Sequence, residues 1–412
     1  MIFAIAWRNL WRNKLRSSVI FVSIAVGIIG AVFSGGFMAG MADQREDAAI
    51  ANEVSNIQIH NPKFLLNEEA QYMVPGAQQK VSEIEKIPQV KGVSDRLKVT
   101  GMAASANAGA GITIRGVNIA QELKVSDINQ YILHGTYLTE NDKYPAVIGQ
   151  KLSHKLDLGL GDKIIITLSD SSGTITSGAF TIVGIYKTSN NQFDESNVFV
   201  KKKDLAKLVG YPASAGNEIA IRLYSNLDTP MVTKKLNKMM AGEVQSKKII
   251  IQSWDEIQPL LKSMVAMMDY FSYLFLIIIM AALAFAIINT MLMAVMERTR
   301  EIGMLMALGM NKRKIFNMIL LETIFLSVIG AIVGLGISML VVHYFATYGL
   351  DLTHSASGLN SFGYSARIFF RVNNGFYLTS LILVVIIAII SGISPALKAL
   401  KLQPATAIRE NN

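Results

Sequence analysis

The feature that most constrains this chain is an uncharged, strongly apolar run over residues 270–296. About 20 such residues are enough for a helix to cross the hydrocarbon core of a bilayer, and a longer run crosses it with some tilt. Charged residues follow the run without a break, beginning with Glu297 and Arg298. The run therefore predicts a transmembrane helix that ends at a charged segment on the membrane surface.

The composition indicates a membrane protein. Of 412 residues, 51% are hydrophobic, which exceeds the usual share in soluble domains. The formal net charge of +9 could indicate nucleic-acid binding, but the basic residues cluster beside the apolar runs, as the positive-inside rule predicts. We therefore expect no nucleic-acid partner. Because the chain has no cysteine, disulfides, thiolate metal sites and a cysteine nucleophile are excluded.

Further apolar runs predict a protein with four membrane spans. We expect transmembrane helices at 18–42, 263–296, 315–345 and 376–397. The first run is longer than the apolar region of a signal peptide, so we expect it to be retained. The basic flanks place both termini and residues 297–314 in the cytoplasm, and the loop at 346–375 outside it. The cytoplasmic ends are an amphipathic helix at 1–17, with Trp7, Trp11 and Leu15 on one face, and a tail at 398–412.

Residues 43–262 have the composition of a soluble domain, and the predicted topology places them outside the cytoplasm. The fold class is therefore membrane α-helical, with one large extracytoplasmic α+β domain inserted between the first two spans. Residues 169–173 predict a hairpin turn. Period-two alternation predicts strands at 54–59, 111–117, 163–168, 179–186, 197–200, 218–224 and 247–251, and helical spacing predicts helices at 78–86, 201–209 and 229–241.

No catalytic motif can be assembled from this sequence. The histidines form no metal-spaced pair, and HExxH, GxSxG and the GxxxxGK[ST] nucleotide-binding motif are absent. We therefore expect a non-catalytic chain without a catalytic residue, metal ligand or cofactor. Glu322 lies inside the third span, where an ionisable residue is a functional candidate. The sequence offers it no obvious partner, which favours a packing or snorkelling role over proton-coupled transport.

The charged segment after the second span predicts a short amphipathic helix. Such a helix could lie on lipid headgroups or in a groove of a partner protein. Glu297 and Glu301 favour a protein, because anionic lipid would repel them. The predicted apolar face consists of Ile302, Leu305, Met306 and Gly309, with Arg298 and Glu301 on the charged face.

Adaptable apolar side chains gather near the outer ends of the first two spans. Methionine suits surfaces that accept varied apolar ligands, so these residues predict a cavity for a lipid or lipophilic substrate, although ordinary helix packing would use the same residues. The candidates are Phe33, Phe37, Met41, Met264, Met267, Met268, Phe271 and Phe275. Small residues that would let helices approach closely are Gly36, Gly40, Gly330 and Gly334.

Four motifs resemble those of the MacB/FtsX/Lol family of ABC transporter permeases, also called type VII. Residues 297–303, Glu-Arg-Thr-Arg-Glu-Ile-Gly, and the Ala-Leu-Gly at 307–309 resemble the signature after the family's second span. Residues 6–10 resemble its N-terminal elbow, 394–399 the end of its fourth span, and 403–409 its C-terminal tail. The order of spans around one large outer domain is also similar.

The resemblance implies a permease dimer in the inner membrane, bound to two cytoplasmic ATPase subunits that carry ATP and Mg²⁺. It implies that the chain is of the separate-subunit type, and that its outer domain has Porter-like flanks and a Sabre-like insert at about 98–215. ATP-driven closure would move the coupling helix, the second span would act as a rigid rod, and the outer domain would expel its ligand. The implied coupling residues are Glu297, Arg298, Arg300, Glu301, Gly303, Leu305 and Gly309.

Residues 36–41 and 57–62 look most like the entry into the outer domain of the lipoprotein-releasing LolC/LolE permeases. That likeness implies a lipoprotein cargo, a periplasmic carrier that receives it, and either a second copy or a sister permease as partner. Efflux of peptides or antibiotics, and FtsX-like regulation of cell-wall hydrolases, are alternatives within the family. A proton-driven transporter that uses Glu322 is an alternative from another class.

Overall fold

The computed structural model describes residues 3, 6–8, 12, 14–67 and 69–401, without the side chains of residues 14–16 and 67. Trp11 and the tail motif at 403–409 lie outside the described residues. The chain divides into two compact units. The helical unit comprises Met1–Asp43, Ala266–Asp351 and Arg367–Asn412, and the sheet unit comprises Gln44–Val265 and Leu352–Ala366.

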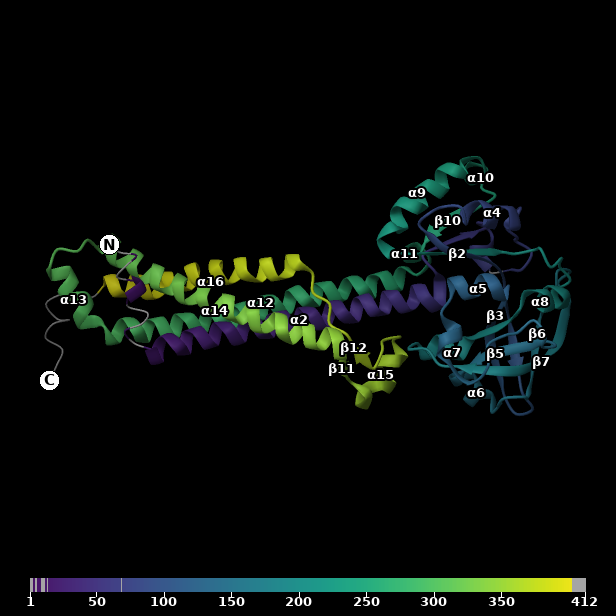
Figure 1. The fold of residues 1–412 in the computed structure, drawn as a ribbon, viewed down its shortest axis with the longest axis horizontal. Helices are drawn as coiled ribbons and strands as arrows, with labels where there is room; N and C mark the ends of the chain where they lie inside the picture. Colours follow the sequence, from purple (N-terminus) through teal and green to yellow (C-terminus); the bar gives the residue numbers. More distant parts are fainter. Residues whose placement is uncertain (1–2, 4–5, 9–11, 13, 68, 402–412) are drawn as a thin grey trace. The chain divides into compact units, whose positions relative to one another are not determined.

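Within the described part of the chain, four helices are long and apolar enough to cross a membrane (Figure 1). They are α2 (Lys14–Ala49), α12 (Pro259–Glu297), α14 (Lys312–Tyr348) and α16 (Asn374–Leu400). A large mixed α+β domain lies between the first and second of them in the chain, so the predicted fold class is confirmed. The chain is a multi-pass membrane protein. Both α2 and α12 extend beyond the predicted spans at 18–42 and 263–296.

Glycine brings two of these helices into close contact. A Cβ atom on Gly334 would lie 2.9 Å from the Ala25 Cα, and one on Gly330 would lie 3.0 Å from the Phe21 carbonyl oxygen. Both positions are therefore places where α14 packs against the backbone of α2, as small residues in membrane helices allow.

The neighbour of Gly36 and Gly40 differs from the helix that their spacing predicts. A Cβ on Gly40 would lie 2.3 Å from the Phe369 carbonyl oxygen, and the Arg371 N–H donates to the Gly36 carbonyl oxygen at 3.2 Å. The segment between β12 (Arg367–Ile368) and α16 is therefore what packs on these glycines, and it is not helical. Glycine admits it because an extended backbone needs the same close approach as a helix.

The sheet unit is built on a continuous path of strands, β10-β1-β9-β2-β3-β8-β5-β7-β4, with β6 pairing β2 and β7. β2 (Val90–Ala104) belongs to both halves: Val90 to Arg96 pair with β9, and Leu97 to Ala104 pair with β3. The first lobe contains β1 (Ile57–His60), β9 (Glu218–Leu223), β10 (Ile250–Ser253), α4 (Ala77–Ile84) and α9 (Thr229–Met239). The second lobe contains β3 (Gly109–Val117), β4 (Ile132–Gly135), β5 (Pro145–Gly149), β6 (Lys163–Ser169), β7 (Ile175–Tyr186) and β8 (Asn197–Lys201).

Short helices complete the second lobe: α5 (Ile119–Val125), α6 (Gln150–Leu156), α7 (Asn191–Ser196) and α8 (Lys202–Val209). The hairpin predicted at 169–173 is confirmed, because β6 and β7 pair from Lys163↔Thr181 to Ser169↔Ile175. The Asp170 carboxylate closes the turn by accepting the backbone N–H groups of Ser172 and Thr174 at 2.8 and 2.9 Å.

The predicted strands and helices agree with the structure for most of the sheet unit. Two strand positions need correction: Ile50–Val54 is a π-helix, so β1 begins only at Ile57, and the strand predicted at 247–251 begins at Ile250. The long strand β2 and the short strands β4 and β5 were not predicted. The loop expected at 346–375 also contains the pair β11 (Leu350–Asp351) and β12, and the helix α15 (Ala356–Ser361).

Candidate functional site

A sharp corner separates α12 from the next helix, α13 (Thr299–Ala307). Arg298 stands at the corner with φ −104° and ψ 16°, which is outside the helical range, so α12 ends at Glu297. The Thr299 hydroxyl donates to the Met296 carbonyl oxygen at 2.6 Å and satisfies one acceptor that the helix end exposes. The charged segment after the second span is therefore a separate short helix, as the sequence predicts.

Gly309 ends α13 with a tight turn. Its φ of +87° is a conformation that side chains disfavour. The Gly309 N–H donates to the Met306 carbonyl oxygen and the Met310 N–H donates to the Leu305 carbonyl oxygen, both at 3.0 Å. This is the Schellman pattern of a helix C-terminus. The Asn311 side chain then accepts the Arg313 N–H and begins α14.

The outward face of α13 differs from the predicted apolar face. Ile302 and Gly303 are buried, and Leu305 and Met306 are half-buried. Ile302 and Met306 belong to the apolar core of the helical unit. The exposed residues Arg300, Met304 and Leu308 follow each other at intervals of four, and Leu308 is 85% exposed. Of the predicted apolar face, Ile302, Leu305 and Met306 thus pack inward while Gly309 is exposed. The sequence-based prediction missed Met304 and Leu308, although their spacing was visible.

Ion pairs connect the corner to two other elements of the helical unit. The Arg298 guanidinium donates from one nitrogen to both carboxylate oxygens of Glu322 at 3.0 Å, and from Nε to Glu301 at 3.1 Å. Arg12 of the N-terminal segment also donates to Glu301. Charges of alternating sign therefore run from the N-terminal segment through α13 to α14. The expectation that Glu322 has no partner was wrong, because its partner lies 24 residues away in the chain.

The environment holds Glu301 in its charged form. The hydrogen bond from Arg12, with a second one from Arg298, lowers the pKa of the Glu301 carboxyl, and partial burial only partly opposes this. The side chains of Arg298 and Glu322 are more enclosed than Glu301, at 17% and 11% exposure against 41%. The ion pairs therefore become less solvated toward α14, where screening by solvent weakens them least.

A cavity of about 320 Å³ lies beside these ion pairs. Its lining is mostly polar and comes from the N-terminal segment and from α2, α12, α13 and α14. The lining residues are Arg12, Ser17, Ile20, Met291, Ala294, Glu297, Arg298, Glu301, Glu322 and Leu326. No group of three or more His, Asp or Glu side chains in the described part of the chain is arranged to hold a metal ion.

The residues proposed for a lipophilic cavity fall into two groups. Phe33 and Phe37 pack edge-on against Phe370, with ring centroids 4.9 and 5.9 Å apart, and Phe345 stacks on the same ring at 4.9 Å. Met41 is buried. In contrast, Met267, Phe271 and Phe275 of α12 are 38–45% exposed, and Met264 and Met268 are half-buried. The aromatic side chains of α2 thus contact the segment before α16, which sequence reasoning did not include.

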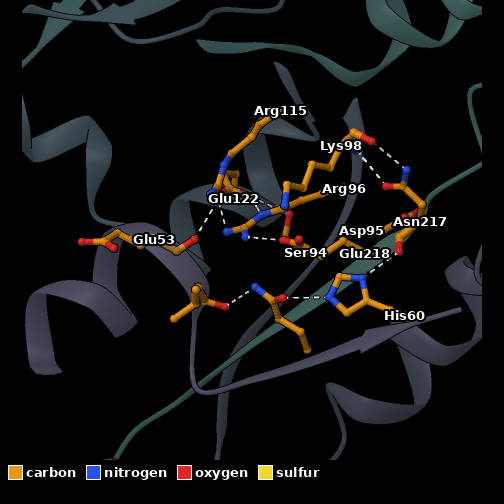
Figure 2. A network of polar contacts seen from close by, with 12 residues as sticks. Glu53, His60, Ser94, Asp95, Arg96, Lys98, Arg115, Glu122, Asn217 and Glu218 are labelled. Atoms are coloured by element: carbon orange, nitrogen blue, oxygen red, sulfur yellow. Dashed lines mark hydrogen bonds and ion pairs between the residues drawn. The ribbon is translucent and has the colours of Figure 1, made fainter. Parts of the chain in front are cut away.

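The sheet unit contains a second polar network, at the point on β2 where the two lobes meet (Figure 2). Arg96 of β2 donates to both oxygens of Glu122 at 2.7 and 2.9 Å and to Glu218 at 2.8 Å. All three side chains are at least 97% buried. Burial alone would raise the pKa of Glu218, but the charge of Arg96, with His60 and Arg115 nearby, lowers it to about 2.

The same network fixes the end of the helix that enters the domain. Arg115 of β3 donates to the Glu53 carbonyl oxygen at 2.8 Å, and the Gln58 side chain donates to the Val54 carbonyl oxygen at 2.6 Å (Figure 2). The Asp127 N–H donates to the Ala51 carbonyl oxygen at 3.1 Å. The acceptors left free at the end of a helix are therefore satisfied by the sheet unit, which holds the π-helix Ile50–Val54 in place.

Two protein families match different parts of the chain. Residues 17–239 match the MacB-like periplasmic core domain, and residues 273–404 match the FtsX-like permease C-terminal domain. An uncharacterised ABC transporter permease of Methanocaldococcus jannaschii is 24% identical over 416 residues, which cover 99% of this chain and 97% of that protein. The macrolide export ATP-binding/permease protein MacB of Escherichia coli is 24% identical over 353 residues, 82% of this chain and 52% of MacB.

MacB of Neisseria meningitidis is 26% identical over 233 residues, 56% of this chain and 34% of that protein. The chain thus spans between a third and about half of the length of these MacB relatives. Among solved structures, the periplasmic region of MacB from Actinobacillus actinomycetemcomitans has a TM-score of 0.38 and 14% identity, and the match covers 53% of this chain and 96% of that region. The extracellular domain of YknZ from Gram-positive bacteria gives 0.34 and 15%, covering 48% and 99%.

Proposed function

This chain belongs to the MacB/FtsX type of ABC transporter permease, and on that premise we propose that a separate ATP-hydrolysing subunit drives it through α13. The observation that carries the proposal is the geometry of α13. Its inner face is packed, both of its ends are fixed, and it presents Arg300, Met304 and Leu308 outward. An exposed apolar pair next to a cation suits a groove on a partner protein, since helices dock by such i, i+4 anchors.

Family membership supports an ATP-hydrolysing partner. The 412 residues contain no GxxxxGK[ST] motif, so the nucleotide site would lie outside this sequence. The concentration of basic residues beside α13 supports a cytoplasmic position for this segment and for both termini. Nucleotide-driven closure of the ATPase would then move α13, and the complex would contain two permease chains and two ATPase subunits.

For the cargo, we favour lipoproteins released from the inner membrane to a periplasmic carrier. The support is the sequence likeness of residues 36–41 and 57–62 to lipoprotein-releasing permeases. Export of a peptide or an antibiotic is the second candidate, and the match to macrolide export proteins favours it. Mass spectrometry of molecules that co-purify with the complex in nanodiscs separates them: a diacylated or triacylated protein supports release, whereas a bound small molecule supports export.

The docking face of α13 can be tested by co-purification. We expect the double variant Met304→Asp, Leu308→Asp to lose its ATPase subunit when both are expressed together, because the carboxylates would have to be desolvated in an apolar groove. Leu227→Asp is the control, since Leu227 of the sheet unit is 90% exposed, close to the 85% of Leu308, and also receives a carboxylate. Retention of the ATPase by the α13 variant would refute the proposed docking face.

A further inference from the structure

Motion of α13 can reach the membrane spans only through the elements that its two ends contact. The backbone leads from α13 into α12 through Arg298, and the departure from helical geometry at this residue makes it a joint. If no side chain held this residue against a neighbouring helix, α13 could change its angle to α12 without moving the spans. The other end of α13 is tied to α14 by the short turn at Gly309. The contacts at the Arg298 end therefore decide whether α13 moves independently of the spans or together with them.

Glu322 supplies the lateral support. It lies on α14, about three turns after the helix begins at Lys312, and its neighbours Met318, Ile319, Thr323 and Leu326 are buried. Both of its carboxylate oxygens accept from a single Arg298 nitrogen at 3.0 Å. Because the pair is mostly enclosed, separating the charges would leave each poorly solvated, so the contact resists opening.

We propose that Glu322 is a positioning residue that clamps the α12–α13 corner to α14, so that motion of α13 is delivered to the second and third spans together. The backbone carries the motion into α12, and the Arg298–Glu322 pair carries it into α14. α13 is then fixed to α14 at both of its ends and cannot rotate alone. The Arg12–Glu301 contact adds the N-terminal segment to the same unit, and the rings of Trp7 and Phe325, 5.8 Å apart, join that segment to α14.

This role also accounts for an acidic residue inside a membrane span. Its two carboxylate oxygens accept from the Arg298 guanidinium, and ionisable residues inside membrane spans are usually paired in this way. The pair needs no partner chain to form. The mechanical consequence rests on the proposed function, but the clamp itself can be measured on the permease alone, so that failure of one is distinguishable from failure of the other.

The experiment uses the absence of native cysteine. Cysteines at Met304 on α13 and Ile332 on α14, both exposed, carry spin labels in the full chain reconstituted in nanodiscs without ATPase. Pulsed electron paramagnetic resonance then measures the distribution of distances between the two spin labels. We expect a narrow distribution in the parent and a broadened and shifted one in Glu322→Gln. Arg313→Gln is the control, since it removes an exposed charge at the start of α14.

An unchanged distribution in Glu322→Gln would overturn the proposal. So would equal broadening in the Arg313→Gln control, because loss of any charge near the start of α14 would then loosen the corner. If Glu322→Gln does not fold, Glu322→Asp replaces it, since it keeps the charge but withdraws the carboxylate by one methylene, and the same broadening is expected. Co-purification of the ATPase with each variant is scored separately and reports only on the proposed function.

Discussion

Arg298 and Gly309 bracket α13, and each acts in a different way. The backbone of Arg298 leaves the helical range, and its side chain forms ion pairs with Glu301 and Glu322. Gly309 acts through the backbone alone, with φ +87° and no atom within 4 Å of the place where a Cβ would stand. A substitution at Gly309 therefore tests conformational strain without introducing a steric clash.

Gly309→Ala is expected to destabilise the C-terminal turn of α13 by about 1 kcal/mol, because an L-residue pays this cost in the left-handed region. Hydrogen exchange of the α13 amides should accelerate in the variant. Gly336→Ala is the matched control: Gly336 lies inside α14 with open space around it, so alanine should be neutral or slightly stabilising there. Equal exchange in the parent and in Gly309→Ala would contradict the Schellman turn.

The buried carboxylates of the sheet unit give opposite pH dependences. Glu218 has its pKa lowered to about 2, so its stabilisation is complete above its unfolded value near 4.5 and is lost as pH falls toward 2. Burial raises the pKa of Asp194 to about 6, although Thr188 donates to it. Ionisation of Asp194 therefore costs stability as pH rises from its unfolded value near 3.8 to about 6.

Glu218→Gln is expected to flatten the acid side of the stability profile. The shift of Glu218 corresponds to about 3 kcal/mol at neutral pH, at about 1.4 kcal/mol for each pKa unit. Thermal unfolding of the full chain in nanodiscs, followed by circular dichroism between pH 2 and pH 7, should show a lower melting temperature for the variant at pH 7 and convergence with the parent near pH 2. A constant difference at every pH would show that Glu218 contributes through packing instead.

At the scale of elements, α12 has the properties of a stiff connector. Its 39 residues contain no glycine, and their single proline is Pro259 at the first position, where a helix tolerates it. The usual causes of a sharp kink are thus missing from its interior sequence. The clamp at Glu322 changes the rod model that the sequence suggests, since α14 would carry part of the motion.

Insertion of two glycines after Leu260 tests whether α12 must be continuous. We expect the variant to keep its ATPase, because α13 is untouched, but to lose the response of the sheet unit to ATP. The readout is the ATP-induced change in distance between spin labels at Leu227 in two copies of the permease. The rod model predicts that the change disappears, and a change as large as in the parent would exclude that model.

The sequence was sufficient for the four spans and for most strands of the second lobe, because these elements follow simple hydrophobic periodicity. It failed at β2, where Ser94, Asp95 and Arg96 are buried among charged partners and interrupt the alternation that marks a strand. The sequence also failed to indicate the partner of Glu322, because the ion pair with Arg298 depends on how α13 and α14 pack. Charged residues that are paired far away in the chain look solvated or isolated in the sequence.

On the scale of the whole molecule, we propose that energy enters at α13 and that other parts of the chain handle the cargo. An ATPase subunit would then bind over Met304 and Leu308, and motion would pass from the corner at Arg298 into α12 and α14. Family membership implies an ATPase partner, and the identity of the cargo is independent of where that partner binds. The central claim is therefore the contact between α13 and an ATPase.

A photo-crosslinker attached to a cysteine at Leu308 tests this contact most directly, because the chain has no other cysteine. The labelled permease is expressed in its native host, irradiated in membrane vesicles whose cytoplasmic face is accessible, and its adducts are identified by mass spectrometry. The same probe at Leu227 of the sheet unit is the control. The account predicts an ABC ATPase subunit in the Leu308 adduct and not in the Leu227 adduct. Adducts at Leu308 that contain only lipid or a second permease would contradict it.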